Sequence, residues 1–176
     1  MPDDDTKFDY VIVGGGSAGC LMANRLSADS KNRVLLVEAG KKDSYPWIHI
    51  PVGYLYCIGN PRTDWMYNTE PELGLNGRTQ RYPRGKILGG CSSINGMIYM
   101  RGQARDYENW AKVTRDETWN WENALEAFKS HEDHWRLDKG ADPLTSNNSR
   151  FSDMHGHGGE WRIEKQRLSW DVLDSF

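Results

Sequence analysis

FDYVIVGGGSAG at residues 8–19 and VLLVEAG at residues 34–40 decide the fold of this chain. The β-branched and aromatic residues at 8–13 predict a buried strand, which the glycine cluster ends abruptly. An apolar helical pattern follows, and its members are expected on one face: Ala18, Leu21, Met22 and Leu26. After a polar turn at 29–32, the apolar residues at 34–37 predict a second strand. A strand, a helix and a strand in this order predict a βαβ unit with parallel strands and a right-handed crossover.

The glycines follow the spacing Gly14-x-Gly16-x-x-Gly19, directly after the predicted strand and at the start of the predicted helix. There the first glycine permits a tight turn, the second lets the backbone approach a pyrophosphate, and the third lets the helix pack against the strand. Free N–H groups and the helix dipole then hold the anion. Glu38 ends the second strand, where a carboxylate accepts hydrogen bonds from ribose hydroxyls and repels a 2′-phosphate. The pattern predicts a dinucleotide site and leaves FAD and NAD both open; a tight turn between packed elements is the alternative.

A second glycine-rich stretch, RGKILGGCSSINGM at residues 84–97, is the most informative part of the sequence. Its glycines and hydroxyl groups indicate a loop whose backbone comes close to another group. The stretch resembles the first signature of the glucose-methanol-choline (GMC) oxidoreductase family, and the pattern continues at Tyr99, Gly102 and Glu108. Cys91 stands where the common form has glycine, serine or threonine, and this small side chain is expected to preserve the loop geometry.

Other stretches carry the same resemblance. The opening at 8–19 is similar to that of the family, the segment 101–110 resembles choline and alcohol dehydrogenase members, and HGHGG at 155–159 resembles their HGxGG segment. Together these stretches extend over nearly the whole chain. The resemblance implies an α/β fold: a Rossmann-like FAD-binding domain with a parallel sheet, helices and a long lid-like insertion, present here in incomplete form.

The resemblance also implies which residues bind FAD. The first glycine motif would hold the pyrophosphate, Glu38 would bind the adenosine ribose, and the second loop would line the flavin. The residues assigned to the cofactor are Gly14, Gly16, Ser17, Gly19, Glu38, Leu88, Gly89, Gly90, Ser92, Asn95, Gly96 and Met97. Some relatives attach FAD covalently through a histidine in this loop. The corresponding position here is Ile94, so we expect non-covalent FAD.

The sequence divides into three segments. Residues 1–40 form the predicted dinucleotide-binding unit, and 41–81 are an irregular, lid-like excursion rich in Pro, Gly, Trp and Tyr. Residues 82–176 hold the flavin-contacting loop, helices and the start of a substrate-domain region.

Local signals inside the third segment predict further elements. A helix is expected at 121–131 with Asn120 as its N-cap, because apolar residues recur there at helical spacing. A polar loop at 139–159, a strand at 160–163 and a helix from Ser169 complete the expected elements.

Composition and charge exclude several classes of protein. The chain has 176 residues and a formal net charge of −3, so no basic field indicates nucleic acid or an anionic membrane as a partner. No apolar run approaches the roughly 18 residues of a membrane span. The acidic N-terminus lacks the features of a signal peptide, so a cytoplasmic location is expected. Cys20, Cys57 and Cys91 are widely spaced and are expected to be reduced thiols.

The histidines give no recognisable metal motif. His131 and His134 are close in sequence, as are His155 and His157, but no acidic or cysteine residue completes a recognisable ligand set with them. No metal site is therefore predicted.

The resemblance implies the FAD-dependent oxidation of a primary or secondary alcohol to an aldehyde or ketone by hydride transfer to flavin. The histidine base of the family lies beyond residue 176 in its pattern, so no catalytic residue is assigned here. The chain is expected to be an N-terminal fragment that is inactive alone and needs a missing C-terminal portion. The alternative is a non-catalytic nucleotide-binding remnant. An NAD-dependent dehydrogenase would leave the loop at 88–95 unexplained.

Overall fold

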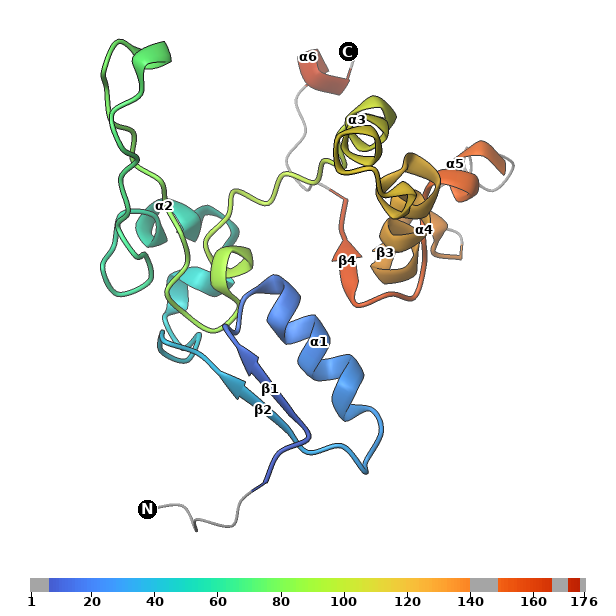
Figure 1. The fold of residues 1–176 in the computed structure, drawn as a ribbon, viewed down its shortest axis with the longest axis horizontal. Coiled ribbons are helices and arrows are strands. Elements are labelled where there is room, and N and C mark those ends of the chain that lie inside the picture. Colours follow the sequence, from blue (N-terminus) through green and yellow to red (C-terminus); the bar gives the residue numbers. More distant parts are fainter. Residues whose placement is uncertain (1–6, 140–148, 166–170, 175–176) are drawn as a thin grey trace. The chain divides into compact units, whose positions relative to one another are not determined.

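The computed structural model describes residues 7–139, 149–165 and 171–174. The chain divides into two compact units, Met1–Ile98 and Tyr99–Phe176 (Figure 1). The predicted segment 82–176 therefore spans parts of both units, because its first residues fold together with the N-terminal half of the chain.

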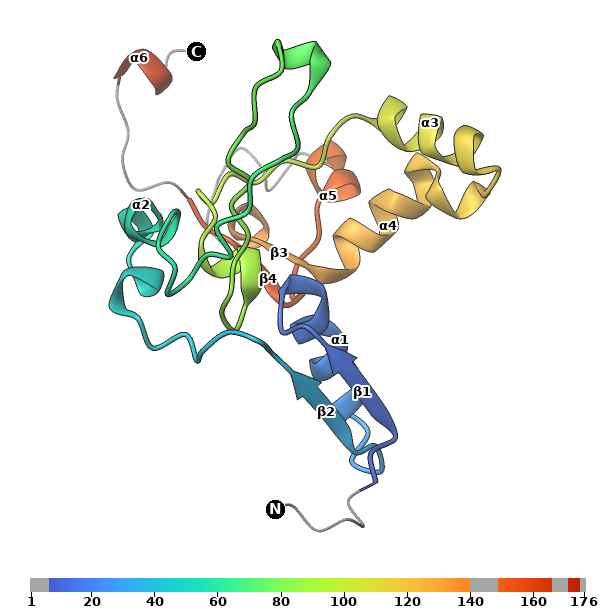
Figure 2. The same cartoon turned by 60° about the vertical axis from the view of Figure 1, so that its left-hand side comes forward.

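The first unit contains the predicted βαβ arrangement. Strand β1 (Tyr10–Val13) pairs in parallel with β2 (Val34–Val37), with Tyr10 opposite Val34. Helix α1 (Ser17–Ser27) connects them and lies along one face of the pair in both views (Figures 1 and 2). The second strand has the predicted bounds, and the first begins two residues later than predicted.

The packed face of α1 differs from the predicted one. Leu21 and Leu26 are half-buried, but Ala18 and Met22 are exposed. The reason is Gly19, where an added Cβ would lie only 1.9 Å from the Gly14 carbonyl oxygen. The helix turns this glycine toward the strand, and the two neighbouring apolar side chains rotate away from it.

The opposite face of the strand pair is apolar and open among the described residues. Val11 is 59% exposed and Val13 is 85% exposed. Parallel sheets are usually covered by helices on both faces. The described part of this unit covers only the face on which α1 lies.

The excursion after β2 contains short helical turns and a ribbon-like arm. The turns are η1 (Pro46–His49), η2 (Pro51–Gly53), α2 (Tyr54–Cys57) and, at the tip of the arm, η3 (Leu73–Leu75). Antiparallel bridges join the two sides of the arm, from Asp64–Gly85 at its base to Glu72–Arg78 near its tip. The arm is the green projection in Figure 1.

The base of this arm is fixed by the buried Asp64 carboxylate. It accepts hydrogen bonds from the backbone N–H groups of Gly59, Met66 and Arg84, at 2.8–3.0 Å. Desolvation by itself would raise the pKa of Asp64. These three donors, with Arg81 nearby, outweigh desolvation and hold the pKa below its ordinary value.

A small apolar core joins the excursion to the second glycine-rich loop. Cys57, Ile87 and Ile94 are buried together, and the half-buried Trp47 and Ile48 pack against them. Lys41 also forms a parallel bridge with Ile87, which continues the line of β2. The loop at 88–97 is therefore anchored through Ile94 to a core whose other residues come from the chain before and after the arm.

The second unit consists of short helices and a second pair of parallel strands. Its elements are α3 (Ala104–Thr114), η5 (Glu117–Trp119), α4 (Trp121–His131), β3 (Glu132–His134), η6 (Trp135–Leu137), α5 (Ser149–Met154), β4 (Trp161–Ile163) and α6 (Asp171–Asp174). Strands β3 and β4 pair with Glu132 opposite Trp161.

Several predicted elements of this unit can be compared with the structure. The prediction for α4 is confirmed, including the N-cap: the Asn120 side chain accepts a hydrogen bond from Asn123 N–H at 3.0 Å. The predicted loop at 139–159 is wrong in part, because α5 lies inside it. Ser169 lies outside the described residues, and α6 begins at Asp171.

Two expectations from composition concern the whole chain. The three cysteines, which all lie in the described ranges, carry free thiols. Among the described residues, no helix combines the length and the apolar character needed to cross a membrane.

Candidate cofactor-binding site

The first glycine motif forms the turn between β1 and α1. Gly14 has a φ of +99°, which favours glycine, and its N–H donates to the Val37 carbonyl at 2.7 Å. Gly16 is the N-cap residue of α1, and no side-chain hydrogen bond caps this end of the helix. A Cβ added to Gly16 would meet nothing within 4 Å, so the space beside it is open. An uncapped helix N-terminus with open space beside a glycine suits a phosphate group.

The other residues predicted in this motif have distinct positions. Ser17 is the first residue of α1 and is exposed. Gly19 lies one turn along the helix, against the backbone of Gly14. The structure thus gives Gly19 a packing role and leaves the approach to the helix N-terminus to Gly16 and Ser17.

The Glu38 carboxylate lies directly against the glycine turn. Its two oxygens accept hydrogen bonds from the Gly15 and Gly40 N–H groups, each at 2.7 Å. An ionised carboxylate has about four acceptor positions, so these bonds leave positions for further donors. The half-buried Glu38 therefore has capacity for the ribose hydroxyls that the sequence pattern predicts.

The second glycine-rich loop meets the first backbone to backbone. Gly89 N–H donates to the Gly15 carbonyl at 2.7 Å. A Cβ added to Gly90 would lie 2.7 Å from the Gly16 Cα, and both Gly89 and Gly90 have positive φ values. Two motifs that are distant in sequence therefore lie directly against each other, because glycine at these positions permits the contact.

The loop beyond Gly90 turns through a short helix, η4 (Gly90–Ser93), which its own hydroxyl groups stabilise. Ser92 Oγ donates to the Gly89 carbonyl at 2.5 Å, and Ser93 Oγ donates to the Leu88 carbonyl at 2.8 Å. These bonds fix the loop without using its outer surface.

The outer surface of this loop carries the remaining predicted residues. Asn95, Gly96 and Met97 are exposed, and the Asn95 side-chain oxygen accepts from Met97 N–H at 2.7 Å. Ile94, in contrast, points into the core with Cys57. The structure thus separates an exposed edge, accessible to a ligand, from the buried Ile94 side chain.

All of the residues predicted to bind the cofactor lie in the first unit. Sequence reasoning missed Gly15 as the residue that contacts both Glu38 and the second loop. It also missed Gly40 and Gly85, where an added Cβ would lie 2.2 Å and 2.1 Å from neighbouring backbone atoms. Gly85 stands in the second glycine-rich stretch, whereas Gly40 is a single glycine after the second predicted strand, so the sequence gave little signal for either contact.

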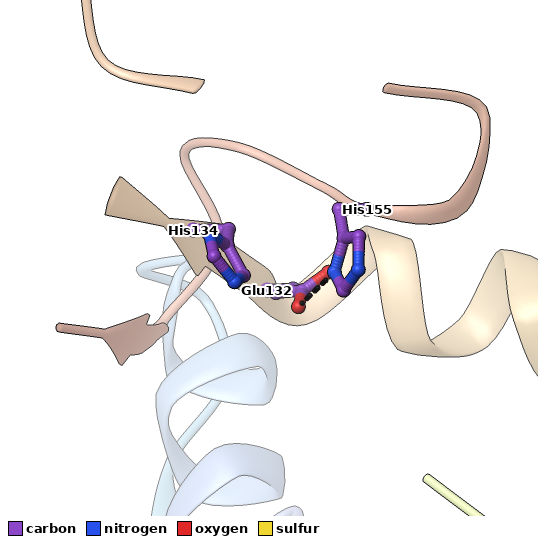
Figure 3. Close-up of side chains that lie close together, drawn as sticks. All are labelled: Glu132, His134 and His155. Atoms are coloured by element: carbon purple, nitrogen blue, oxygen red, sulfur yellow. Dashed lines mark hydrogen bonds and ion pairs between the residues drawn. The ribbon is translucent and has the colours of Figure 1, made fainter. Parts of the chain in front are cut away.

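The second unit contains a polar cluster that the sequence pattern did not reveal. Figure 3 shows His134 and His155 on either side of the Glu132 carboxylate. His155 Nδ1 lies 2.9 Å from one carboxylate oxygen, and the Arg101 guanidinium donates to the other. Folding thus brings His155, which is distant in sequence, to Glu132 and His134, and the sequence pattern did not indicate this grouping.

The side chains of this cluster bond to one another and to nearby backbone, which leaves few free ligand atoms for a metal ion. Glu132 is fully buried, and Arg101 already neutralises it. His134 Nδ1 accepts from Arg136 N–H at 3.2 Å, so the proton of the neutral ring lies on Nε2 and no lone pair remains for a metal. Burial and the neighbouring His155 lower the pKa of His134 and keep the ring neutral.

The Glu132 carboxylate stays ionised despite its burial. Desolvation would raise its pKa, but hydrogen bonds from His155 and Gly156, with the charge of Arg101, hold the pKa below its ordinary value. The second unit holds another group of possible metal ligands, formed by Asp133, Asp138 and His157. Arg162 forms ion pairs with both of these carboxylates, so their charge is already balanced by the protein.

Comparison with known protein families gives one extended match. The model of the family described as GMC oxidoreductase matches residues 8–166. This range contains both glycine motifs of the first unit and most of the second unit.

Curated relatives and solved structures agree with this match. The oxygen-dependent choline dehydrogenase of Staphylococcus xylosus is 49% identical over 97% of this chain and 29% of the relative. The alcohol dehydrogenase [acceptor] of Pseudomonas putida is 44% identical over 89% of this chain and 26% of the relative. Among solved structures, pyridoxine 4-oxidase from Mesorbium loti has a TM-score of 0.76 at 38% identity, over 93% of this chain and 30% of that one. The chain thus spans less than a third of the length of these proteins.

Proposed function

The chain belongs to the GMC oxidoreductase family, in which the N-terminal domain is the FAD-binding part, and on that premise we propose that it supplies the FAD site of an oxidoreductase that oxidises alcohols. The observation that carries the proposal is the contact between the two glycine motifs. Gly89 N–H bonds to the Gly15 carbonyl, and Gly90 lies against Gly16, which borders open space. A Rossmann-type motif alone is compatible with several dinucleotides, whereas the second loop is part of the GMC pattern.

The described residues fit the parts of FAD. The pyrophosphate would bind at Gly14, Gly16 and Ser17, next to the uncapped N-terminus of α1, with Gly19 allowing the helix to approach. Glu38 would accept hydrogen bonds from the adenosine ribose, through acceptor positions that Gly15 and Gly40 leave free.

The flavin would lie along the second loop. Its lining would be the backbone and exposed side chains of Leu88, Gly89, Gly90, Ser92, Asn95, Gly96 and Met97. Bound FAD supplies the acceptor for a hydride from the substrate carbon. The loop orients the ring, and the buried Ile94 offers no nucleophile for a covalent bond, so we propose non-covalent binding.

The alcohol substrate is proposed from the relatives, two of which are named as choline and alcohol dehydrogenases. A base that takes the hydroxyl proton must lie within hydrogen-bond reach of the substrate. The GMC pattern places that base after the part matched here, so we propose that these 176 residues bind FAD and do not turn over substrate by themselves. The second candidate, a nucleotide-binding remnant without turnover, would share the same site.

Titration of FAD into the purified chain tests this proposal. We expect quenching of flavin fluorescence and perturbed absorption bands near roughly 380 and 450 nm, with all flavin released on denaturation. Gly16→Ala is the test variant. Its new methyl group would enter open space in the protein but block a pyrophosphate, so we expect it to bind FAD more weakly than the wild type. Equal binding of FAD by both proteins, or no binding by either, would contradict the proposed site.

A further inference from the structure

The Glu38 carboxylate is bonded to the protein backbone, and binding a ribose does not require these bonds. Both of its carboxylate oxygens are bonded to backbone N–H groups, Gly15 on one side and Gly40 on the other, each at 2.7 Å. Gly15 is buried inside the first glycine motif, and Gly40 begins the chain segment that leaves β2. The carboxylate therefore bridges the turn after β1 and the end of β2.

Gly15, whose N–H is bonded to Glu38, is also bonded through its carbonyl to the second loop. Its carbonyl accepts hydrogen bonds from Gly89 N–H at 2.7 Å and from Cys20 Sγ at 3.2 Å. A Cβ at Gly15 would lie 3.0 Å from Leu88 Cδ1 and 3.3 Å from Glu38 Cβ. The two peptide groups that flank the Gly15 Cα are thus held, the N–H of one by Glu38 and the carbonyl of the other by the second loop.

From these contacts we propose that Glu38 is a positioning residue for the phosphate-binding turn, in addition to its contact with the ribose. The inference rests on the proposed FAD site. Because the Gly15 N–H is committed to Glu38, it is withdrawn from the phosphate, which is left with the N–H groups at the start of α1. A negative charge this close to a phosphate is unfavourable by itself. The geometry it imposes on the turn offsets that repulsion.

Glutamine at position 38 separates the two functions of the carboxylate. An amide of the same shape keeps one acceptor oxygen but turns an NH2 group toward the other backbone N–H, and two donors cannot bond to each other. Glu38→Gln therefore loses the bond to Gly15 or to Gly40. Glu70→Gln on the exposed arm makes the same change in charge away from the turn and serves as the control.

The first experiment needs no cofactor. NMR on the unliganded wild-type chain should detect a scalar coupling across the hydrogen bond between the Gly15 amide nitrogen and the Glu38 carboxylate carbon. In Glu38→Gln, the Gly15 or Gly40 amide should exchange with solvent about tenfold faster, while amides in α4 keep their rates. A wild-type chain without this coupling would overturn the proposal even if the variant failed to fold.

The second experiment compares adenosine with ADP, which differ by the pyrophosphate. If Glu38 only binds ribose, Glu38→Gln lowers both affinities by the same factor. If it also positions the turn, the advantage of ADP over adenosine falls by about a further tenfold, and Glu70→Gln leaves that advantage unchanged. Equal losses for both ligands would overturn the positioning role. A wild-type chain that shows the coupling but binds neither ADP nor FAD would instead contradict the proposed function.

Discussion

Replacing Gly19 with alanine should force α1 away from β1. The new Cβ would lie 1.9 Å from the Gly14 carbonyl oxygen and 3.1 Å from the Gly14 carbonyl carbon, whereas real Cβ atoms keep at least 3.0 Å from their neighbours. The obstacle is backbone in a tight turn, so no side chain can move aside. The helix must retreat until the shorter distance reaches that limit, and the βαβ packing opens.

The cost follows from the size of this clash. Overpacking by one methyl group typically destabilises a protein by about 1–3 kcal/mol, and contact with fixed backbone places this case near about 3 kcal/mol. For a chain of this size, each kcal/mol lowers the melting temperature by about 2–4 °C. We therefore expect Gly19→Ala to lower the melting temperature of the chain by about 6–12 °C.

Thermal unfolding and urea unfolding, both followed by circular dichroism, provide the assay, with Gly16→Ala as the partner variant. Gly16 has a φ of −78° and open space around it, so alanine there should cost only the about 1 kcal/mol by which alanine is the poorer N-cap residue. FAD affinity should nevertheless fall by more than about tenfold. A Gly19→Ala protein as stable as the wild type would refute the packing argument.

Three further predictions concern buried groups. Asp64→Asn should lower the free energy of unfolding by about 1–3 kcal/mol at pH 7. Because the folded pKa of Asp64 is depressed, this difference should be complete above the ordinary value of 3.8 and decline as the pH falls below it toward the lower folded pKa, in unfolding curves from pH 3 to 7. Glu132→Gln removes the fully buried charge that pairs with Arg101, whose side chain is only 9% exposed, and should cost about 3–5 kcal/mol in the same assay. A thiol reagent should label the exposed Cys91 first and Cys57 last, since burial raises the pKa of the Cys57 thiol.

Each of these predictions has its own contrary outcome. A cost of Asp64→Asn that does not change between pH 3 and 7 would exclude the carboxylate charge as the cause. Glu126→Gln changes a glutamate whose side chain is 72% exposed, and a cost as large as that of Glu132→Gln would refute the argument from burial. Equal labelling rates for the cysteines would show that the core around Cys57 opens rapidly.

Local sequence signals predicted the elements that depend on local interactions. The strand at 34–37 has its predicted bounds because a short apolar run lies between polar residues and glycine. The start of α4 was predictable because Asn120 caps it with its own side chain. The face of α1 was not, because apolar spacing pointed to Ala18 and Met22 while the close approach at Gly19 set the rotation of the helix.

The candidate site was predictable in its residues but not in its contacts. Glycine spacing identified the two loops, yet no local pattern shows that Gly90 lies against Gly16. The arm forms from residues without strand-like alternation, through bridges that depend on the pairing of its two sides. Glu132 bonds to His155, which follows α5 and is 23 residues away in sequence, so the residues next to Glu132 gave no indication of this partner.

The contact between the two glycine loops also sets an order of events during folding. The turn after β1 emerges early in synthesis, but the cradle is complete only when Gly89 and Gly90 reach it, after the whole arm has been made. Contacts between residues this distant in sequence carry a loop-closure cost and form late. A ligand that contacts both loops can therefore find its complete site only after the residues on both sides of the arm have been made.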